Sequence, residues 1–191
     1  MSDECSHHTT DSDDAGLVAC YQDRGCQSSL NLLVERHLPR VHQLLSSLLL
    51  DESLADDLAQ EVFLRAIRGL SGFQKGAAFT TWLYRIAMNV AYSHFEKQHR
   101  TSQLNQQFHA EPAAREPSPE QAASARELEH EIERALADLS PTLRGAIVLT
   151  CLESVPAETA AEIEGCSVST MYWRIHEARR QLKSRLQRYF A

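Results

Sequence analysis

Hydrophobic residues recur at steps of three and four along most of the 191-residue sequence, and this spacing limits the possible folds more than any other feature. It places the hydrophobic residues on one side of an α-helix, where they can pack against a core. The clearest example is a stripe near the C-terminus formed by Val168, Met171, Ile175, Ala178, Leu182 and Leu186. Alternation with a period of two, typical of β-strands, is not evident, and the 7 glycines leave few tight turns. The sequence therefore predicts an all-α protein.

A proline-rich segment divides the helical patterns into two groups. Residues 105–125, NQQFHAEPAAREPSPEQAASA, contain three of the chain's 6 prolines, which disfavour helix and extend the backbone. We expect this segment to be a flexible linker between two small helical domains, residues 17–104 and 126–191. Residues 1–16 are polar and acidic without periodicity, which is typical of a disordered tail.

The net charge of −7 argues against a generic nucleic-acid binder, but the charges are unevenly distributed. Residues 1–16, 51–61 and 111–138 are acidic, whereas residues 65–100 and 167–191 each carry six bases and one acid. Local potential, rather than net charge, decides where phosphates bind. The two basic segments are therefore candidate nucleic-acid surfaces.

An acidic helix is predicted over residues 53–67, SLADDLAQEVFLRAI. Ser53 is the expected N-cap, and Asp56 follows three residues later, as in a capping box. The residues expected to face a core are Leu54, Leu58, Val62, Phe63 and Ile67. The residues expected to point outward are Asp56, Asp57, Gln60, Glu61, Leu64, Arg65 and Arg68. Without further information, a solvated surface is the simplest interpretation of this outward face.

Residues 79–100, FTTWLYRIAMNVAYSHFEKQHR, predict a helix with two dissimilar faces. One face has core spacing and consists of Leu83, Ile86, Ala87, Val90 and His94. The other consists of Trp82, Arg85, Asn89, Tyr92 and Glu96. Aromatic rings interleaved with a cation and an amide suit single-stranded nucleic acid. A second buried face is the alternative interpretation.

Residues 156–186 have the layout of a helix-turn-helix. Gly165 can adopt the positive φ of the turn, and Ser167 can cap the helix that follows. The side of that helix opposite its hydrophobic stripe could enter a major groove, where an α-helix fits. It carries Ser169, Tyr172, Trp173, His176, Glu177 and Arg180. The alternative is that Tyr172 and Trp173 pack on a neighbouring helix.

The order of these motifs resembles a known family. DDLAQEVFLRAIRGLSGF, FTTWLYRIAMNVA, a proline-rich linker, LADLSPTLRGAIVLTCLE and a terminal helix-turn-helix follow one another along the chain. The small two-domain bacterial sigma factors called extracytoplasmic-function (ECF), within the sigma-70 family, have this order. The resemblance covers about Leu17 to Ala191 and includes several motifs at the expected separations.

The resemblance implies an alternative sigma factor that directs core RNA polymerase to particular promoters. It implies that the acidic helix binds polymerase through Asp56, Asp57, Gln60, Glu61 and Leu64. It implies that the melted minus-ten promoter element is contacted by Phe73, Lys75, Phe79, Trp82, Arg85 and Asn89. It implies that the duplex minus-thirty-five element is read by Ser169, Thr170, Tyr172, Trp173, Arg174, His176, Glu177, Arg179 and Arg180.

The resemblance also implies partners and a setting. An anti-sigma factor, often membrane-anchored in the family, would hold the protein inactive until a stress signal releases it. No cofactor and no catalysis are expected. Family members often have Arg or Lys where this sequence has Tyr172 and Glu177, so the promoter sequence does not follow from the resemblance.

The sequence leaves two other classes of function as alternatives. A stand-alone helix-turn-helix regulator would account for residues 126–191 but would leave the acidic helix unused. An enzyme or metalloprotein would need a catalytic motif or a closed ligand set. The spacing of Cys20, Cys26, His37 and His42 matches no zinc pattern.

The sequence predicts a cytoplasmic protein that does not insert into membranes. The longest apolar patch, VHQLLSSLLL, is interrupted and too short to span a bilayer. The N-terminus has no cationic start and no apolar run of the kind that marks a signal peptide. Five cysteines without regular pairing agree with a reducing compartment.

Overall fold

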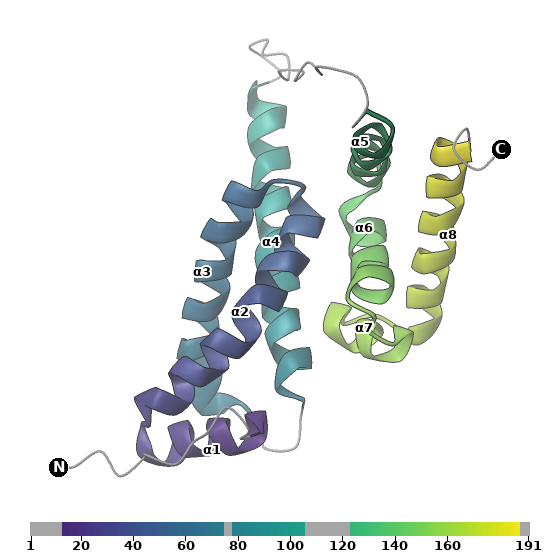
Figure 1. The fold of residues 1–191 in the computed structure, drawn as a ribbon. Coiled ribbons are helices and arrows are strands. Elements are labelled where there is room, and N and C mark those ends of the chain that lie inside the picture. Colours follow the sequence, from purple (N-terminus) through teal and green to yellow (C-terminus); the bar gives the residue numbers. More distant parts are fainter. Residues whose placement is uncertain (1–12, 75–77, 106–122, 188–191) are drawn as a thin grey trace. The chain divides into compact units, whose positions relative to one another are not determined.

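The computed structural model describes residues 13–74, 78–105 and 123–187. The described residues form helices joined by short connections and contain no β-strand, in agreement with the all-α prediction. The chain divides into two compact units. Among the described residues, the first unit holds α1 to α3, the start of α4 up to Val90, and Glu162–Gly165, and the second holds the rest, which includes α5, α6 and α8; Figure 1 labels these helices. Within the described ranges, we find no helix that is both long and apolar enough to cross a membrane.

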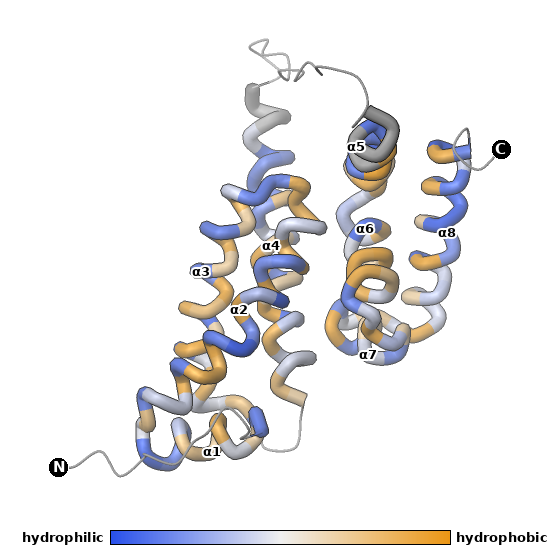
Figure 2. The backbone as a smooth tube through the Cα atoms, viewed as in Figure 1, coloured by the Kyte–Doolittle hydropathy of each residue, from blue (hydrophilic) through white to orange (hydrophobic). Residues whose placement is uncertain are grey.

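The first unit is a helical bundle with a closely packed core. It contains α1 (Asp14–Arg24), α2 (Gln27–Leu49), α3 (Glu52–Gly69), η1 (Leu70–Gly72, a 3-10 turn) and the first part, up to Val90, of α4 (Phe79–Asn105). Hydrophilic and hydrophobic residues alternate along α2 and α3 (Figure 2), as expected for helices with one buried side. Leu33, Phe63, Leu70 and Phe79 line a cavity of only about 10 Å³ where α2, α3, η1 and α4 meet. Little empty space therefore remains where these four elements meet.

The first helix starts earlier than expected and is tied to the second by an acidic residue. The Asp13 carboxylate caps α1 by accepting from the Gly16 N–H at 2.8 Å, so residues 14–16, which we expected in the disordered tail, are helical. The Asp14 carboxylate accepts from Arg36 Nη1 at 2.7 Å and pairs with His37 Nε2 at 2.8 Å. His37 is buried, and this burial lowers its pKa although Asp14 acts in the opposite direction. The neutral imidazole is therefore favoured near pH 7.

The third helix has a different N-cap from the one predicted. Asp51, rather than Ser53, caps α3, and its side chain accepts from the Leu54 N–H at 3.1 Å. Ser53 lies inside the first turn because α3 begins at Glu52. A carboxylate at the cap also interacts favourably with the positive end of the helix dipole, so the acidic residue is the better cap here.

The second unit contains a second set of helices held together by a buried cation. It contains the end of α4, α5 (Ala123–Ala137), α6 (Pro141–Ile147), the π-helical turn η2 (Val148–Leu152), most of α7 (Ala157–Glu164) and α8 (Val168–Leu186). Arg144 is 8% exposed, and its guanidinium donates to the carbonyl oxygens of Leu136 and Ala137 at 2.8 and 2.9 Å. These carbonyls lie in the last turn of α5, where partners within the helix are missing, and the Leu136 oxygen also accepts from the Leu139 N–H at 3.2 Å. Burial lowers the pKa of Arg144.

Local signals predicted the turns of the second unit correctly. Ser140 caps α6, with Pro141 in the first turn. Gly165 has φ of +62° between α7 and α8, and Ser167 caps α8 by accepting from the Thr170 N–H at 3.1 Å. The predicted hydrophobic stripe of α8 is partly wrong. Val168 is 41% exposed because it lies at the first helical position, whereas Met171 and most of the stripe are buried.

Candidate nucleic-acid and protein interfaces

One side of α3 forms an acidic surface with a hydrophobic residue in it. Asp57, Gln60 and Leu64 are exposed, with Leu64 at 49%, and Glu61 is half-buried and accepts from Arg65 Nε at 2.7 Å. Asp56 differs from these residues because its carboxylate contacts His42 Nε2 on α2 at 3.0 Å. The surface available to a partner is therefore centred on Asp57, Gln60 and Leu64. An exposed leucine among acidic groups suits a protein partner with a hydrophobic patch and basic residues around it.

The opposite side of α3 shows which residues make the core. Val62 and Phe63 are buried as predicted, whereas Leu54, Leu58 and Ile67 are only half-buried. The remaining buried positions of α3 are small residues, namely Ala55, Ala59 and Ala66. Their small side chains let α2 approach α3 closely, which displaces the larger leucines toward the edge of the contact.

The two phenylalanines predicted to contact the minus-ten element lie in an aromatic cluster. Phe73 and Phe79 are 8% and 7% exposed, and their ring centroids are 5.8 Å apart. Trp82 packs against both, with centroid distances of 5.1 Å to Phe73 and 5.6 Å to Phe79. Lys75 lies outside the described residues.

The remaining predicted minus-ten residues follow the exposed side of α4. Trp82 is half-buried, while Arg85 and Asn89 are exposed. The helix does have a wider buried arc than predicted, but it is formed by Tyr84, Met88 and Ala91 beside Leu83 and Ala87. Ile86 and His94, which we expected in the core, are half-buried. Arg85 and Asn89 are thus exposed on the helix that also carries Trp82, and Arg85 Nη2 donates to the Glu162 carbonyl oxygen at 2.5 Å.

The outward side of α8 is exposed over its first three turns. Tyr172 and Trp173 are 53% and 62% exposed, which is unusual for side chains of this size. Ser169, His176, Arg179 and Arg180 are exposed as well, and the half-buried members of the predicted set are Thr170, Arg174 and Glu177. Aromatic rings, hydroxyls and guanidinium groups thus share one side of a helix that follows a tight turn. This side can offer apolar contacts, hydrogen bonds and positive charge to a DNA groove.

A hydrogen bond between helices fixes one side chain of this surface. The Tyr172 hydroxyl donates to Glu158 Oε1 of α7 at 2.9 Å, which links the two helices of the helix-turn-helix. The pKa of Glu158 is lowered, first by a hydrogen bond from its own backbone and then by Tyr172. The same bond raises the pKa of the Tyr172 phenol.

The carboxylate of Glu177 accepts hydrogen bonds from two neighbouring side chains of α8. It accepts from Arg180 Nε and Nη2 at 2.8 and 2.6 Å and from Gln181 Nε2 at 2.7 Å. These bonds, mainly those from Arg180, lower the pKa of Glu177 to about 2. Glu177 is therefore ionised at every physiological pH, and part of its charge is neutralised by Arg180.

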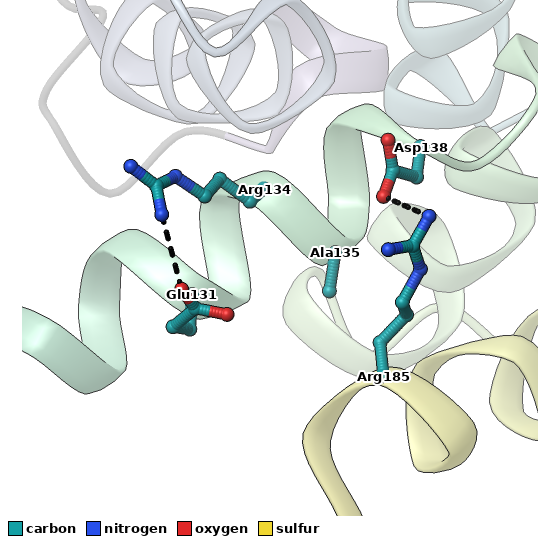
Figure 3. Close-up of a pocket in the computed structure, with 5 residues that line it drawn as sticks. All are labelled: Glu131, Arg134, Ala135, Asp138 and Arg185. Atoms are coloured by element: carbon teal, nitrogen blue, oxygen red, sulfur yellow. Dashed lines mark hydrogen bonds and ion pairs between the residues drawn. The ribbon is translucent and has the colours of Figure 1, made fainter. Parts of the chain in front are cut away.

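A surface hollow of about 480 Å³ between α5 and α8 is lined by charged groups (Figure 3). Arg185 Nη2 of α8 contacts Asp138 Oδ2 at 2.7 Å, and Arg134 Nη1 contacts Glu131 Oε1 at 3.1 Å (Figure 3). Ala135 completes the lining. Since the charges are paired with one another, the arrangement tethers the end of α8 and presents no isolated charge for a ligand.

The described residues contain no cluster of three or more histidine, cysteine, aspartate or glutamate side chains that could hold a metal ion. His37 and His42 each contact an aspartate instead. The sequence interpretation also missed a residue of interest, Gln22 of α1, because its partners lie 48 and 51 residues away in the sequence. No local pattern marks such a contact.

Comparison with known proteins identifies both units. The Sigma-70 region 2 family matches residues 33–101, and the Sigma-70 region 4 family matches residues 129–182. The RNA polymerase sigma-H factor of Pseudomonas aeruginosa is 33% identical over 186 residues, which cover 93% of this chain and 96% of the relative. The ECF RNA polymerase sigma-E factor of Escherichia coli K12 is 34% identical over 172 residues, covering 86% and 90% of the two chains.

Solved structures agree with these matches. CnrH, solved in complex with the cytosolic domain of CnrY, gives a TM-score of 0.69 at 26% identity and covers 91% of this chain and 97% of its own. The sigma factor RpoE of Bartonella quintana, solved with the anti-sigma factor NepR, gives 0.67 at 27% identity and covers 82% and 96%. Both matched regions and the similarity to these relatives over most of the chain lead to one conclusion. The chain belongs to the extracytoplasmic-function sigma factors of the sigma-70 family.

Proposed function

We propose that this chain is an alternative sigma factor that binds core RNA polymerase and selects promoters for transcription initiation. The observation that carries the proposal is that one chain of this family presents both an exposed acidic side of α3 and an exposed reading side of α8. A sigma factor needs both kinds of surface, because it must hold polymerase and DNA together. A stand-alone DNA-binding regulator needs only the second. The protein would act as a stoichiometric factor and not as an enzyme.

The two DNA elements are assigned to different units. Arg85 and Asn89 would contact the melted minus-ten strand, with the exposed part of Trp82 available for stacking on a base. Phe73 and Phe79 would act indirectly, because they pack against Trp82 and hold its ring in position. Lys75 would contact phosphate. The exposed side of α8, Ser169 to Arg180, would read the minus-thirty-five duplex in the major groove.

We also propose that an anti-sigma factor controls the protein. CnrH and RpoE, both similar to this chain over most of its length, were solved with CnrY and NepR, respectively. The cytosolic domain of CnrY is the part present in the first complex. An inhibitor bound to the corresponding surfaces here would cover the polymerase and DNA contacts together. The site of action would be the cytoplasm, where core polymerase and promoter DNA are found.

Reconstituted transcription tests the proposal. Core RNA polymerase from a related bacterium should give specific run-off transcripts from a fragmented genomic library only when the full chain is added. The Asn89→Ala variant should bind core normally but melt duplex promoters poorly, as measured by permanganate reactivity of the minus-ten region. If the chain instead bound palindromic DNA as a dimer and gave no transcript with core polymerase, the stand-alone regulator would be the correct assignment.

A further inference from the structure

The segment Gly69–Phe73 connects the end of α3 to the loop that precedes α4, and two residues from other helices contact it. Gln22 of α1 contacts it through hydrogen bonds, and Trp82 of α4 contacts it through its indole. Both contacts lie within the first unit. The proposed minus-ten residues follow directly on α4, so the position of this segment affects how they are presented.

Gln22 fixes the backbone of the segment with both hydrogens of its amide nitrogen. Nε2 donates to the Leu70 carbonyl oxygen at 2.8 Å and to the Phe73 carbonyl oxygen at 2.9 Å. The last carbonyls of a helix and of the turn that follows it have no partner within the helix. The Leu70 carbonyl also accepts from the Phe73 N–H of its own turn, at 3.2 Å. Gln22 therefore completes the hydrogen bonding of a helix end from another helix.

The indole of Trp82 packs against the same segment. A Cβ atom placed on Gly69 would lie 3.3 Å from Trp82 Cζ2, so the ring lies against the bare backbone of this glycine. The Trp82 ring also packs on Phe73, with a centroid distance of 5.1 Å. Gln22 therefore holds the carbonyl of the same residue whose ring supports Trp82.

We propose that Gln22 is a positioning residue for minus-ten recognition, which makes α1 part of the promoter-melting apparatus. By fixing the carbonyls of Leu70 and Phe73, it places the Phe73 ring and thereby the Trp82 indole before DNA arrives. A surface that is already ordered loses less conformational entropy when it captures a base. The inference rests on the proposed function, since it concerns how the same minus-ten surface is held in place.

Three variants of the full chain test this role. Gln22→Met keeps the length and packing of the side chain but removes both donors. Gln22→Glu keeps the shape but places a carboxylate against two carbonyl oxygens. Gln27→Met is the matched control, because Gln27 is an exposed glutamine at the start of α2 that bonds only locally, to Asn31 Oδ1 at 3.2 Å.

The assay separates minus-ten capture from the other steps. Wild-type holoenzyme first selects a promoter from a randomised library. Each variant is then measured for affinity to core polymerase, to the duplex minus-thirty-five fragment and to a forked template whose minus-ten non-template strand is single-stranded. Gln22→Met should bind the fork about tenfold more weakly, the cost of ordering about one backbone residue during binding. Its affinities for core and for the duplex fragment should remain within about twofold of wild type, and Gln27→Met should match wild type throughout.

A pH series adds a signature that altered packing would not produce. When the carboxyl of Gln22→Glu is protonated at lower pH, it regains one O–H donor for one of the two carbonyls. Its fork affinity should therefore rise relative to that of Gln22→Met as the pH falls, with wild type measured at each pH as reference.

Several outcomes would overturn the inference. Wild-type fork affinity in Gln22→Met would do so, and so would a parallel loss of core, duplex and fork binding, which would show that Gln22 only stabilises the fold. If the wild-type holoenzyme itself did not prefer the fork over duplex DNA, the minus-ten assignment in the proposed function would fail, and the inference with it.

Discussion

Glu177 and Arg179 lie two residues apart on α8, but their surroundings give them different roles. The Glu177 carboxylate is held by Arg180 and Gln181, whereas Arg179 is exposed and its Nη2 lies 3.5 Å from Cys151 Sγ. A carboxylate oxygen has more than one lone pair, so Glu177 can still accept from a cytosine amine while it holds Arg180. Arg179 can contact a phosphate without losing a strong protein partner.

We therefore predict that Glu177→Ala changes the preferred base at one position of the minus-thirty-five element by about tenfold. Arg179→Ala should weaken binding to all promoter sequences alike and should lower the slope of the salt dependence of binding by about one. Binding of holoenzyme to a panel of single-base promoter variants at several salt concentrations measures both effects. Because Glu177→Ala also removes the hydrogen bonds between Glu177 and Arg180, Arg180→Ala is the control for their loss. If Glu177→Ala and Arg180→Ala both caused the same uniform loss, base reading by Glu177 would be wrong.

The hydrogen bond from the Tyr172 hydroxyl should be detectable in the pKa of Glu158. Tyr172→Phe removes a hydrogen bond that lowers the pKa of Glu158, so this pKa should rise toward its ordinary value of 4.5. A depressed carboxyl pKa stabilises the fold above the unfolded pKa and loses this effect as the pH falls. The stability difference between Tyr172→Phe and wild type should therefore be largest above pH 4.5 and should shrink below it.

Carboxyl NMR titration, together with denaturant unfolding at several pH values, checks this expectation. Trp173→Phe is the matched control, because it alters the adjacent aromatic ring and leaves the Tyr172 hydroxyl in place. An unchanged Glu158 pKa in Tyr172→Phe would show that the hydroxyl does not contact Glu158 in solution.

At the scale of whole elements, α3 and α4 each combine a buried side with an exposed side. Small alanines let α3 pack closely on α2, and this leaves Asp57, Gln60 and Leu64 facing outward. In α4, the buried arc is wide enough to fix the helix firmly while Arg85 and Asn89 remain exposed. The binding sides are thus supported by rigid elements.

Reversing charge on the outer side of α3 should weaken polymerase binding. We expect Asp57→Lys combined with Glu61→Lys to reduce affinity for core polymerase at least tenfold, because the proposed partner surface must be complementary to acidic groups. Asp23→Lys with Glu35→Lys, on α1 and α2, changes the net charge equally and should have little effect. Binding of labelled chain to core, with helix content followed by circular dichroism, measures this. Equal affinities of the two double variants for core polymerase would show that α3 is not part of the interface.

The contact between Gly69 and Trp82 predicts a difference between two neighbouring glycines. A Cβ at Gly69 would lie 3.3 Å from the indole, whereas one at Gly72 would meet nothing within 4 Å. In a Trp173→Phe background Trp82 is the only tryptophan, and Gly69→Ala should then shift its fluorescence emission while Gly72→Ala should not. The stability of Gly69→Ala should change by less than about 1 kcal/mol, since the higher helix propensity of alanine offsets the displaced ring. Identical emission spectra for the two variants would contradict this contact.

At the scale of the whole molecule, the two units divide the work of the protein. Each has its own buried core and its own exposed binding side, and α1 to α4 and α5 to α8 follow one another in the chain. Covalent connection then makes binding of the second unit effectively intramolecular once the first has bound.

We predict that residues 13–104 and 123–187, produced as separate fragments, each fold to a helical domain. The first fragment should bind core polymerase with near-native affinity. An equimolar mixture of the two should support at least about a hundredfold less transcription than the full chain at the same low concentration, because the effective concentration is lost. Circular dichroism of each fragment and run-off transcription measure these outcomes. Full activity of the mixture would show that connection of the units is unnecessary.

Local sequence signals determined the element types and several of their ends. Helical periodicity predicted the all-α fold, and Ser140, Gly165 and Ser167 were identified as caps and turn because their roles depend only on neighbouring backbone. The outward side of α3 was also predicted, since charges at helical spacing indicate a solvated face whatever lies behind it. The order of motifs along the chain was sufficient to indicate the family, which the comparisons then confirmed.

Tertiary structure decided which apolar and polar residues meet. Periodicity defines a helix face but not the shape of the surface that covers it, so the buried residues of α3 include alanines where leucines were predicted, and Val168 is exposed. Phe73 and Phe79 proved to be buried supports for Trp82 because they come together across a loop. The contact of Gln22 with Leu70 and Phe73 depends on how α1 packs within the first unit, and no short window of sequence contains that information.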